Sequence, residues 1–237
     1  MPNPGITTAI LLAAGEGSRL RSAAASKPLC HVGGRPLIDR AIHGLAEAGL
    51  QRVVVVLGYE AEAIEAHLAA RDWPIAVETV RTSDYRQPNG VSVLAAEAAV
   101  AGGEALLAMC DHLVEPALYA RVAQAGAGGG ARLAIDRGIH SDLVDLDDVT
   151  CVRTQGEAIT AIGKHLPDYD AFDTGVFAIG GALFAALHTL PAPSLTEGMR
   201  VLAAQGSALT VDCSDLAWID VDDPAALDKA EDWLRAA

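Results

Sequence analysis

Two cations on a glycine-rich loop are the first residues of this sequence that could do chemistry. An apolar run ends in a loop that carries Gly15, Gly17 and Arg19, and Lys27 follows a few residues later. Glycine allows positive φ and lets backbone N–H groups approach an anion closely, while the two cations can neutralise phosphate charge. The segment therefore predicts a loop that holds the phosphates of a nucleoside triphosphate.

Two other kinds of phosphate-binding loop fit this segment less well. A Walker loop requires Gly-Lys-Ser or Gly-Lys-Thr, and a dinucleotide fingerprint requires a third glycine where this chain has Leu20. Together with the following Ser26-Lys27-Pro28-Leu29, the pattern resembles the signature of the sugar-nucleotidyltransferase superfamily. The loop residues expected to contact the nucleotide are Leu12, Ala13, Ala14, Gly15, Gly17 and Ser18.

An aspartate after an apolar run is the first candidate metal ligand. In nucleotidyl transfer a phosphate oxygen attacks the α-phosphorus of the triphosphate and pyrophosphate leaves. The protein must therefore align two anions and neutralise charge, which calls for magnesium, carboxylates and a few cations. Asp111 directly follows the apolar run 105–110, although a solvated loop position or a cap before Pro116 would also explain it.

A second candidate lies in the run Trp218-Ile219-Asp220-Val221-Asp222-Asp223-Pro224. Asp223 precedes a proline and so takes the N-cap position of a helix, which leaves Asp222 free to bind a metal. Strand alternation would place Asp220 on the same face, as another ligand or as a neighbour that supports one. We therefore expect Mg²⁺ as the cofactor, with Asp111 and Asp222 as ligands and Asp220 as a further candidate.

Composition and charge limit the classes of partner. The 237 residues carry a formal net charge of −14, which disfavours nucleic acid and anionic membranes because both require a basic face. No apolar run approaches the roughly 18 residues that span a bilayer, so direct membrane insertion is not expected. The first five residues lack the features of an export signal, which favours a cytoplasmic location. The four cysteines form no Cys-x-x-Cys pair, which favours free, buried thiols: Cys30, Cys110, Cys151 and Cys213.

Apolar runs of strand length alternate with segments of helical period through the first half of the chain. Strands are predicted at 7–12, 52–57, 75–80 and 105–109, and helices at 36–50, 60–70 and 91–100. This alternation indicates an α/β fold with a doubly wound, mostly parallel, Rossmann-like sheet. Such sheets bind ligands beyond the carboxyl ends of their strands.

Shorter strands follow the glycine-rich residues 126–130, which we interpret as a turn between a helix and a strand rather than an interdomain linker. The predicted strands are 132–136, 149–153, 158–162, 175–179, 209–212 and 217–219, and the helices are 182–187, 196–204 and a last one from about 224. We predict one nucleotidyltransferase domain over 1–237. Its nucleotide-binding half would reach about 125, and an acceptor-binding β extension would occupy about 126–237.

Several short motifs are similar in order and spacing to those of the CTP:inositol-1-phosphate cytidylyltransferases, over nearly the whole chain. They are residues 109–115 (MCDHLVE), 135–137 (IDR), 162–164 (IGK), 173–177 (DTGVF) and 218–222 (WIDVD). Members of that family usually have glycine before the first aspartate, where this chain has Cys110. We expect the site to tolerate this change.

On the nucleotide side, the resemblance implies that Lys27 contacts the triphosphate and that Arg19 holds the phosphates that leave as pyrophosphate. Asn89, Gly90 and Ser92 match the segment that faces the base in that family. By themselves, however, Asn-Gly is also a good turn and serine is a good residue to start a helix.

On the acceptor side, Lys164 matches the lysine that meets the acceptor phosphate. Glu197 could touch the acceptor, although its favourable interaction with a helix dipole explains it equally well. His112 is expected to support its loop rather than act as a base, because a phosphate dianion needs no deprotonation.

The polyol itself would be faced by Asp136, Arg137, Asp173 and Thr174. A carboxylate can accept two hydroxyl hydrogen bonds and thereby select one ring stereochemistry. Asp136 and Arg137 could equally form a structural ion pair at a strand end.

The resemblance thus implies an Mg²⁺-dependent cytidylyltransferase that joins CTP to inositol 1-phosphate, or to a related polyol phosphate, and releases pyrophosphate. An alternative within the fold uses CTP, UTP or GTP with phosphocholine or a sugar 1-phosphate. An alternative of another class is a catalytically silent nucleotide-binding regulator. Onward transfer of the product would require a separate membrane CDP-alcohol phosphotransferase, and a homodimer is one possible assembly.

Overall fold

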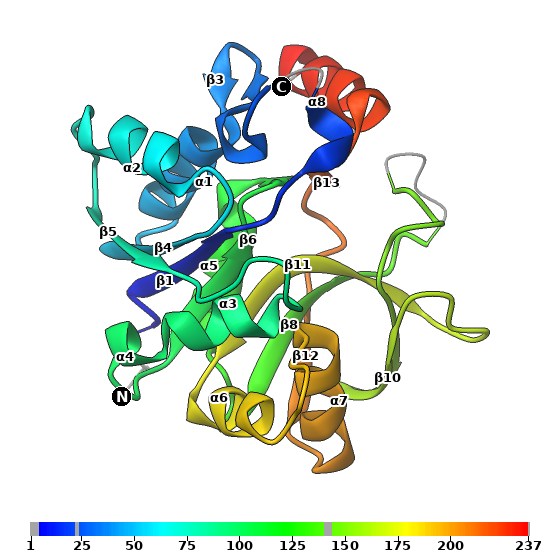
Figure 1. Ribbon diagram of the computed structural model, residues 1–237. Coiled ribbons are helices and arrows are strands. Elements are labelled where there is room, and N and C mark those ends of the chain that lie inside the picture. The colour runs from blue at the N-terminus through cyan, green and yellow to red at the C-terminus, as the bar shows by residue number, and fades with distance from the viewer. Residues whose placement is uncertain (1–4, 22–23, 140–143, 237) are drawn as a thin grey trace.

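The chain folds around a sheet whose strands come from both of its halves (Figure 1). The computed structural model describes residues 5–21, 24–139 and 144–236. Within those residues the sheet has nine strands, in the order β5 (Ala76–Arg81), β4 (Arg52–Leu57), β1 (Thr8–Ala13), β6 (Ala105–Met109), β11 (Ala171–Ile179), β8 (Ala131–Asp136), β12 (Ala208–Asp212), β10 (Ala158–Gly163) and β9 (Cys151–Gln155).

The first four strands of this order form the predicted parallel part. β1 is parallel to β4 and β6, and β4 is parallel to β5. The five residues of β4 after Arg52 are all buried, as expected for a parallel strand covered on both faces. Leu12 lies opposite Met109 near the carboxyl ends of β1 and β6, so the glycine-rich loop and Asp111 leave from neighbouring strands.

The expectation of a mostly parallel sheet is wrong for the second half. Among the described strands there, only β8 and β12 are parallel. β11 is antiparallel to β6, β8 and β9, and β10 is antiparallel to β12 and β9. Antiparallel neighbours can be joined by short loops, so β9, β10 and β11 follow one another without the crossover helices that a parallel arrangement requires.

Helices cover both faces of the sheet, as the doubly wound prediction requires. One face holds α1 (Leu37–Glu47), α2 (Ala61–Ala69) and α5 (Pro116–Ala125), and the other holds α3 (Gly90–Ala95), α4 (Glu97–Val100), α6 (Gly181–His188) and α7 (Leu195–Ala204). β1 contributes alternate side chains to the two cores, Leu11 to the first and Ile10 to the second. The last helix, α8 (Pro224–Ala236), buries Ala230 in a third cluster with Leu20 and Ile219.

Most predicted elements occur with small shifts at their ends. The helix predicted at 91–100 is interrupted at Ala96, where α3 ends and α4 begins. The sequence did not predict three short strands, β2 (His31–Val32), β3 (Arg35–Pro36) and β7 (His112–Val114), because two or three residues are too few to show an alternating pattern. The bounds of α5 were not predicted either. Residues 126–130 do form the predicted turn, between α5 and β8.

Two further observations bear on the composition. All four cysteines are free and buried. Each helix in the described part of the chain is too short or too polar to cross a bilayer.

Candidate active site

A second, two-stranded sheet brings the distant aspartates together. β13 (Trp218–Asp220) is antiparallel to β7, with Asp220 opposite His112. The backbone N–H of Val221 donates to the carbonyl oxygen of Asp111 at 3.0 Å. The segment after β13 therefore lies against the residues that follow β6, and the two predicted carboxylate positions share one site.

Lys27 is the cation at the centre of these carboxylates. It lies in the 3₁₀ turn η2 (Lys27–Leu29), and its Nζ is 2.6 Å from Asp111 Oδ2 and 3.9 Å from Asp220 Oδ1 and also pairs with Asp222. Only 8% of the side chain is exposed. Burial lowers the pKa of Lys27, but the three carboxylates outweigh it and raise that pKa well above its usual range, so the ammonium stays charged.

Gly17 makes room for this buried lysine. It lies just before the 3₁₀ turn η1 (Ser18–Leu20) with φ of 56°, a left-handed conformation that favours glycine. A Cβ atom at this position would lie 2.4 Å from Lys27 Cβ. The second glycine of the loop is therefore needed both for the turn and for the packing of Lys27.

The residues best placed to bind a divalent cation are Asp111, His112 and Asp220, which each offer a ligand atom within 4.8 Å of the others. Asp220 Oδ1 is buried and has no hydrogen-bond partner among the described residues. Burial raises the pKa of Asp220 to about 7. His112 opposes this shift, whereas the neighbouring carboxylates of Asp111 and Asp222 add to it. A carboxylate pair with an unsatisfied buried oxygen fits Mg²⁺, which prefers oxygen ligands.

Asp222, which the sequence favoured over Asp220 as a ligand, mainly contacts cations. Its Oδ2 accepts from Arg19 Nη2 at 2.6 Å, and its Oδ1 pairs with Lys27. The strand ends at Asp220, so simple alternation does not extend to Asp222. The expected cap is present, because Asp223 Oδ1 accepts from the N–H of Ala226 at 2.8 Å.

His112 is held in place by a hydrogen bond and by ring stacking. Its Nδ1 donates to the carbonyl oxygen of Thr174 at 2.8 Å, and its ring stacks on Trp218 with centroids 6.0 Å apart. Gly175 allows this approach, since a Cβ there would lie 2.4 Å from Nδ1. Burial lowers the pKa of His112, but Asp220 and Asp111 outweigh it and raise that pKa. These contacts agree with the predicted supporting role.

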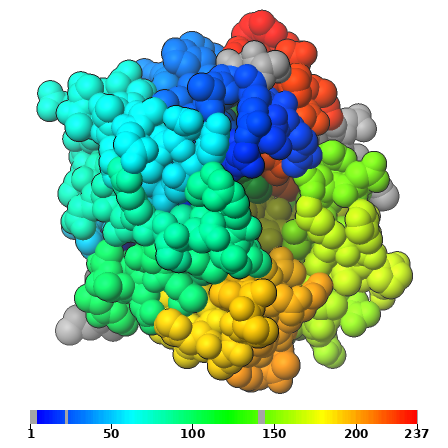
Figure 2. Space-filling view, viewed as in Figure 1, coloured from blue at the N-terminus to red at the C-terminus, as the bar shows by residue number. Residues whose placement is uncertain are grey.

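Two cavities meet at Asp111 and Asp222, which line both. The loop cavity, about 250 Å³, is bordered by the glycine-rich loop, and the central cavity, about 490 Å³, opens toward the second half of the chain. The space-filling view shows a hollow between the blue N-terminal segment and the yellow-green second half (Figure 2). All three lysines of the chain line these cavities, Lys27 in the first and Lys164 and Lys229 in the second.

Most of the predicted nucleotide loop lines the loop cavity. Arg19, Lys27 and the small residue Cys110 line it together with Leu12, Ala13, Gly15, Gly17 and Ser18. Ala14 is buried, and its carbonyl oxygen instead accepts from the N–H of Tyr59 at 3.0 Å.

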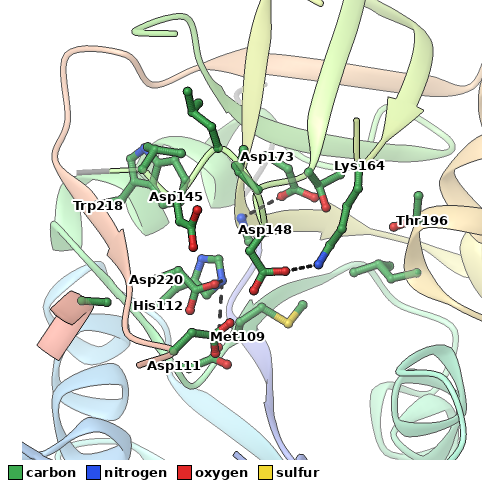
Figure 3. A pocket seen from close by; sticks show the side chains of 18 of the residues that line it. Met109, Asp111, His112, Asp145, Asp148, Lys164, Asp173, Thr196, Trp218 and Asp220 are labelled. Atoms are coloured by element: carbon green, nitrogen blue, oxygen red, sulfur yellow. Dashed lines mark hydrogen bonds and ion pairs between the residues drawn. The ribbon is translucent and has the colours of Figure 1, made fainter. Parts of the chain in front are cut away.

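Lys164 and Asp173, two of the residues predicted to bind the acceptor, line the central cavity (Figure 3). Asn89, predicted on the nucleotide side, also lines it. Burial raises the pKa of Asp173 to about 6, although its Oδ1 accepts a 2.7 Å hydrogen bond from the N–H of Gly175. Asn89 Oδ1 accepts from the N–H of Leu195 at 2.8 Å, which joins the segment before α3 to the start of α7.

Several predicted binding residues are placed elsewhere. Asp136 accepts from the indole N–H of Trp218 at 2.9 Å, and Arg137 pairs with Asp170 and Asp212. Neither lines the two cavities, so the direct contacts with the polyol that the resemblance implied are not supported for these residues. The ion pairs of Arg137 agree with the alternative of a structural role, although Arg137 pairs with Asp170 and Asp212 and not with Asp136.

Four more predicted residues, Thr174, Glu197, Gly90 and Ser92, line neither cavity. Thr174 is fully buried, and its hydroxyl donates to the carbonyl oxygen of Ala134. Glu197 pairs with Arg200, while its neighbour Thr196 lines the central cavity. Gly90 and Ser92 are buried within α3 and do not line either cavity.

Sequence reasoning missed the loop that forms one wall of the central cavity. Residues 144–146 and 148–150 of this loop line it with both apolar and acidic side chains, among them Asp145 and Asp148. The only available signal was the acidic run 142–148 (DLVDLDD), of which residues 142 and 143 lie outside the described part of the chain.

Comparisons with known proteins find relatives over nearly the whole chain. A "Bifunctional IPC transferase and DIPP synthase" from Rubrobacter xylanophilus is 34% identical over 232 residues, which cover 95% of this chain and 51% of that protein. A protein of the same name from Aquifex aeolicus is 29% identical over 233 residues, covering 97% and 52%. The chain therefore spans about half the length of these curated relatives.

Among solved structures, the inositol-1-phosphate CTP transferase from T. maritima has the same fold, with a TM-score of 0.88 over 98% of this chain and 96% of that one, at 23% identity. The family model of the MobA-like NTP transferase domain matches residues 9–208, which reach from β1 to the start of β12. This chain belongs to the family of MobA-like NTP transferase domains.

Proposed function

We propose that this protein is a magnesium-dependent cytidylyltransferase that transfers CMP from CTP to inositol 1-phosphate and releases pyrophosphate. The observation that carries the proposal is the meeting of the loop cavity and the central cavity at Asp111 and Asp222. A reaction that joins two phosphorylated molecules needs two anion sites around one reacting centre. The printed names of the relatives and of the T. maritima structure supply the base and the acceptor.

The loop cavity takes the triphosphate in this proposal. Lys27 is buried and held by carboxylates, so it presents a fixed charge, whereas half of the Arg19 side chain is exposed and can follow the departing pyrophosphate. Backbone N–H groups of the glycine-rich loop add donors that need no further ordering. Together these groups neutralise the charge that develops on the leaving pyrophosphate.

The central cavity takes the acceptor. Lys164 binds its phosphate and brings an oxygen toward the α-phosphorus, which removes the repulsion between two anions. Asp173 lies deeper and accepts hydrogen bonds from ring hydroxyl groups. Asn89, with its neighbours at the start of α7, faces the base.

The carboxylates of Asp111 and Asp220 would hold Mg²⁺ in this proposal, with Asp222 beside them. When bound, the ion supplies positive charge at the triphosphate. Asp222 keeps Lys27 and Arg19 on the loop side of the site, and His112 keeps Asp220 oriented.

The experiment that tests the proposal is pyrophosphate release with magnesium, in which CTP, UTP, GTP and ATP are each combined with inositol 1-phosphate, phosphocholine and glucose 1-phosphate. Release with CTP and inositol 1-phosphate is the expected result. Release with another pair keeps the two-cavity site and rejects the substrates. Nucleotide binding without release from any pair supports the silent regulator instead.

A downstream partner belongs to the same proposal. The relatives are named bifunctional and are about twice as long as this chain. We propose that a membrane CDP-alcohol phosphotransferase uses the CDP-inositol formed here, as the resemblance implies. The single domain, the cytoplasmic location and the homodimer stay predictions.

A further inference from the structure

One carboxylate joins the cations of the two cavities. Asp148, in the loop between β8 and β9, accepts from Arg19 Nη2 at 2.6 Å through Oδ2, and its Oδ1 pairs with Lys164. Figure 3 shows Asp148 and Lys164 pointing toward each other across the central cavity. Arg19 belongs to the loop cavity and Lys164 to the central cavity, so Asp148 is a counter-ion shared by both.

The exposure of the three groups distinguishes this arrangement from the buried charges around Lys27. The side chains of Arg19 and Lys164 are 52% and 53% exposed, and that of Asp148 is 27% exposed. Hydrogen bonds from Lys164 and Arg19 hold the pKa of Asp148 well below its usual range, so it remains a carboxylate. Two accessible cations are thus partly neutralised by one anion that incoming phosphate groups can replace.

We propose that Asp148 occupies the place of substrate phosphate at both cations and couples the two anion sites, because it must leave both cations when one substrate binds. The inference rests on the proposed function for the identity of the two anions. Since Asp148 contacts both cations, the first anion to bind bears the cost of displacing it. The second anion then meets a cation that Asp148 has already left, and its affinity rises.

The proposed coupling is positive: each bound anion raises the affinity for the other, which direct repulsion between them cannot produce. Two anions bound in adjacent cavities repel each other and would weaken each other's binding. A shared counter-ion opposes this effect and favours joint occupation of the site. Asp148 is therefore a positioning residue that links triphosphate binding to acceptor binding.

Inorganic pyrophosphate and inorganic phosphate are suitable probes, because they need neither a base nor a polyol. Their dissociation constants are measured by calorimetry at constant magnesium and low salt, each alone and in the presence of the other at saturation. Asp148→Asn removes the charge and keeps the shape. Each probe alone should bind about two- to fivefold tighter to this variant, as expected for ion pairs with partly exposed partners.

The decisive quantity is the ratio of phosphate affinity with and without pyrophosphate. This ratio should be about two- to fivefold higher in the wild type than in Asp148→Asn. Asp145→Asn is the matched control, because Asp145 lines the same cavity and its carboxylate accepts from the N–H of Asp147, which asparagine can also do. This control should keep the wild-type ratio.

Equal ratios in the wild type and in Asp148→Asn would overturn the inference, as would weaker binding of both probes to the variant. The tighter binding of phosphate alone that Asp148→Asn produces should also vanish when Lys164→Ala is combined with it. These results do not depend on turnover. A failure of CTP and inositol 1-phosphate as substrates would therefore reject the proposed function and leave the coupling measurable.

Discussion

His112 Nε2 lies 3.5 Å from Asp220 Oδ2, and the two residues are paired across the short sheet of β7 and β13. This pairing orients a carboxylate whose other oxygen is buried without a hydrogen-bond partner among the described residues. In the proposed metal site, Asp220 rather than Asp222 is therefore the ligand that accompanies Asp111.

Asp220→Asn should therefore lower turnover about 100-fold or more and raise the magnesium concentration that gives half-maximal rate. Asp222→Asn should also slow the reaction, because it removes one of the carboxylates that hold Arg19 and Lys27, but with a smaller change in the magnesium dependence. Pyrophosphate release measured against magnesium concentration separates the two effects. Equal shifts in both variants would contradict the assignment, and circular dichroism checks the fold of each.

Lys27→Met should destabilise the protein, by about 1–3 kcal/mol, because it leaves the carboxylates around it without their buried counter-ion. Added magnesium should restore part of this loss, since a cation can replace the missing charge. Urea denaturation with and without magnesium measures both. A variant as stable as the wild type would show that Lys27 does not hold these carboxylates together.

Gly17→Ala should lower the stability of the protein by about 1–3 kcal/mol and weaken triphosphate binding. The new Cβ would meet Lys27 at 2.4 Å in a left-handed backbone conformation. Gly15→Ala is the matched control for stability, because nothing lies within 4 Å of a Cβ there. Similar midpoints of unfolding for the two variants would argue against the packing role of Gly17.

Lys164→Ala should raise the KM for the acceptor about tenfold or more and change the KM for the triphosphate much less, because Lys164 lines only the central cavity. Initial rates measured with each substrate varied in turn provide the test. Equal changes in both constants would place this lysine at the triphosphate.

Asp173→Asn should stabilise the protein at neutral pH. The folded-state pKa of Asp173 is raised by burial to about 6, so the folded protein binds more protons than the unfolded chain between about pH 4 and 6. The wild type therefore loses stability from this group as the pH rises through that range. Asparagine keeps an acceptor for the N–H of Gly175 and has no charge to bury.

The advantage of this variant should grow between pH 4 and pH 8, to at most about 3 kcal/mol. Unfolding free energies at both values test this directly. An advantage that stays constant with pH would mean that Asp173 is not the group that titrates.

Local patterns were enough to predict the elements that flank the loop cavity. The Val-rich run of β4 and the strand before the glycine-rich loop are long and apolar, and glycine with two cations indicates phosphate binding without any knowledge of the fold. Asp111 was found for the same reason, because it follows an apolar run directly. The cap at Asp223 needed only the following proline.

Contacts between distant segments were not predictable in the same way. The position of Asp220 opposite His112 depends on the register of β13 against β7, and the hydrogen bond between Asp136 and Trp218 depends on the packing of β8 against the C-terminal segment. The antiparallel second half has no helices between its strands β9, β10 and β11, so the alternation that identifies parallel sheets was missing there.

The sequence by itself determined the α/β fold class, the glycine-rich loop and most of the charged residues of the candidate site, because these follow from periodicity and from the chemistry of neighbouring residues. Only the tertiary structure decided which charges meet. Asp148 is far from Arg19 in the chain, and their ion pair exists because the fold places Asp148, between β8 and β9, beside the loop that follows β1. Electrostatic interactions depend on distance in space, which a linear pattern does not contain.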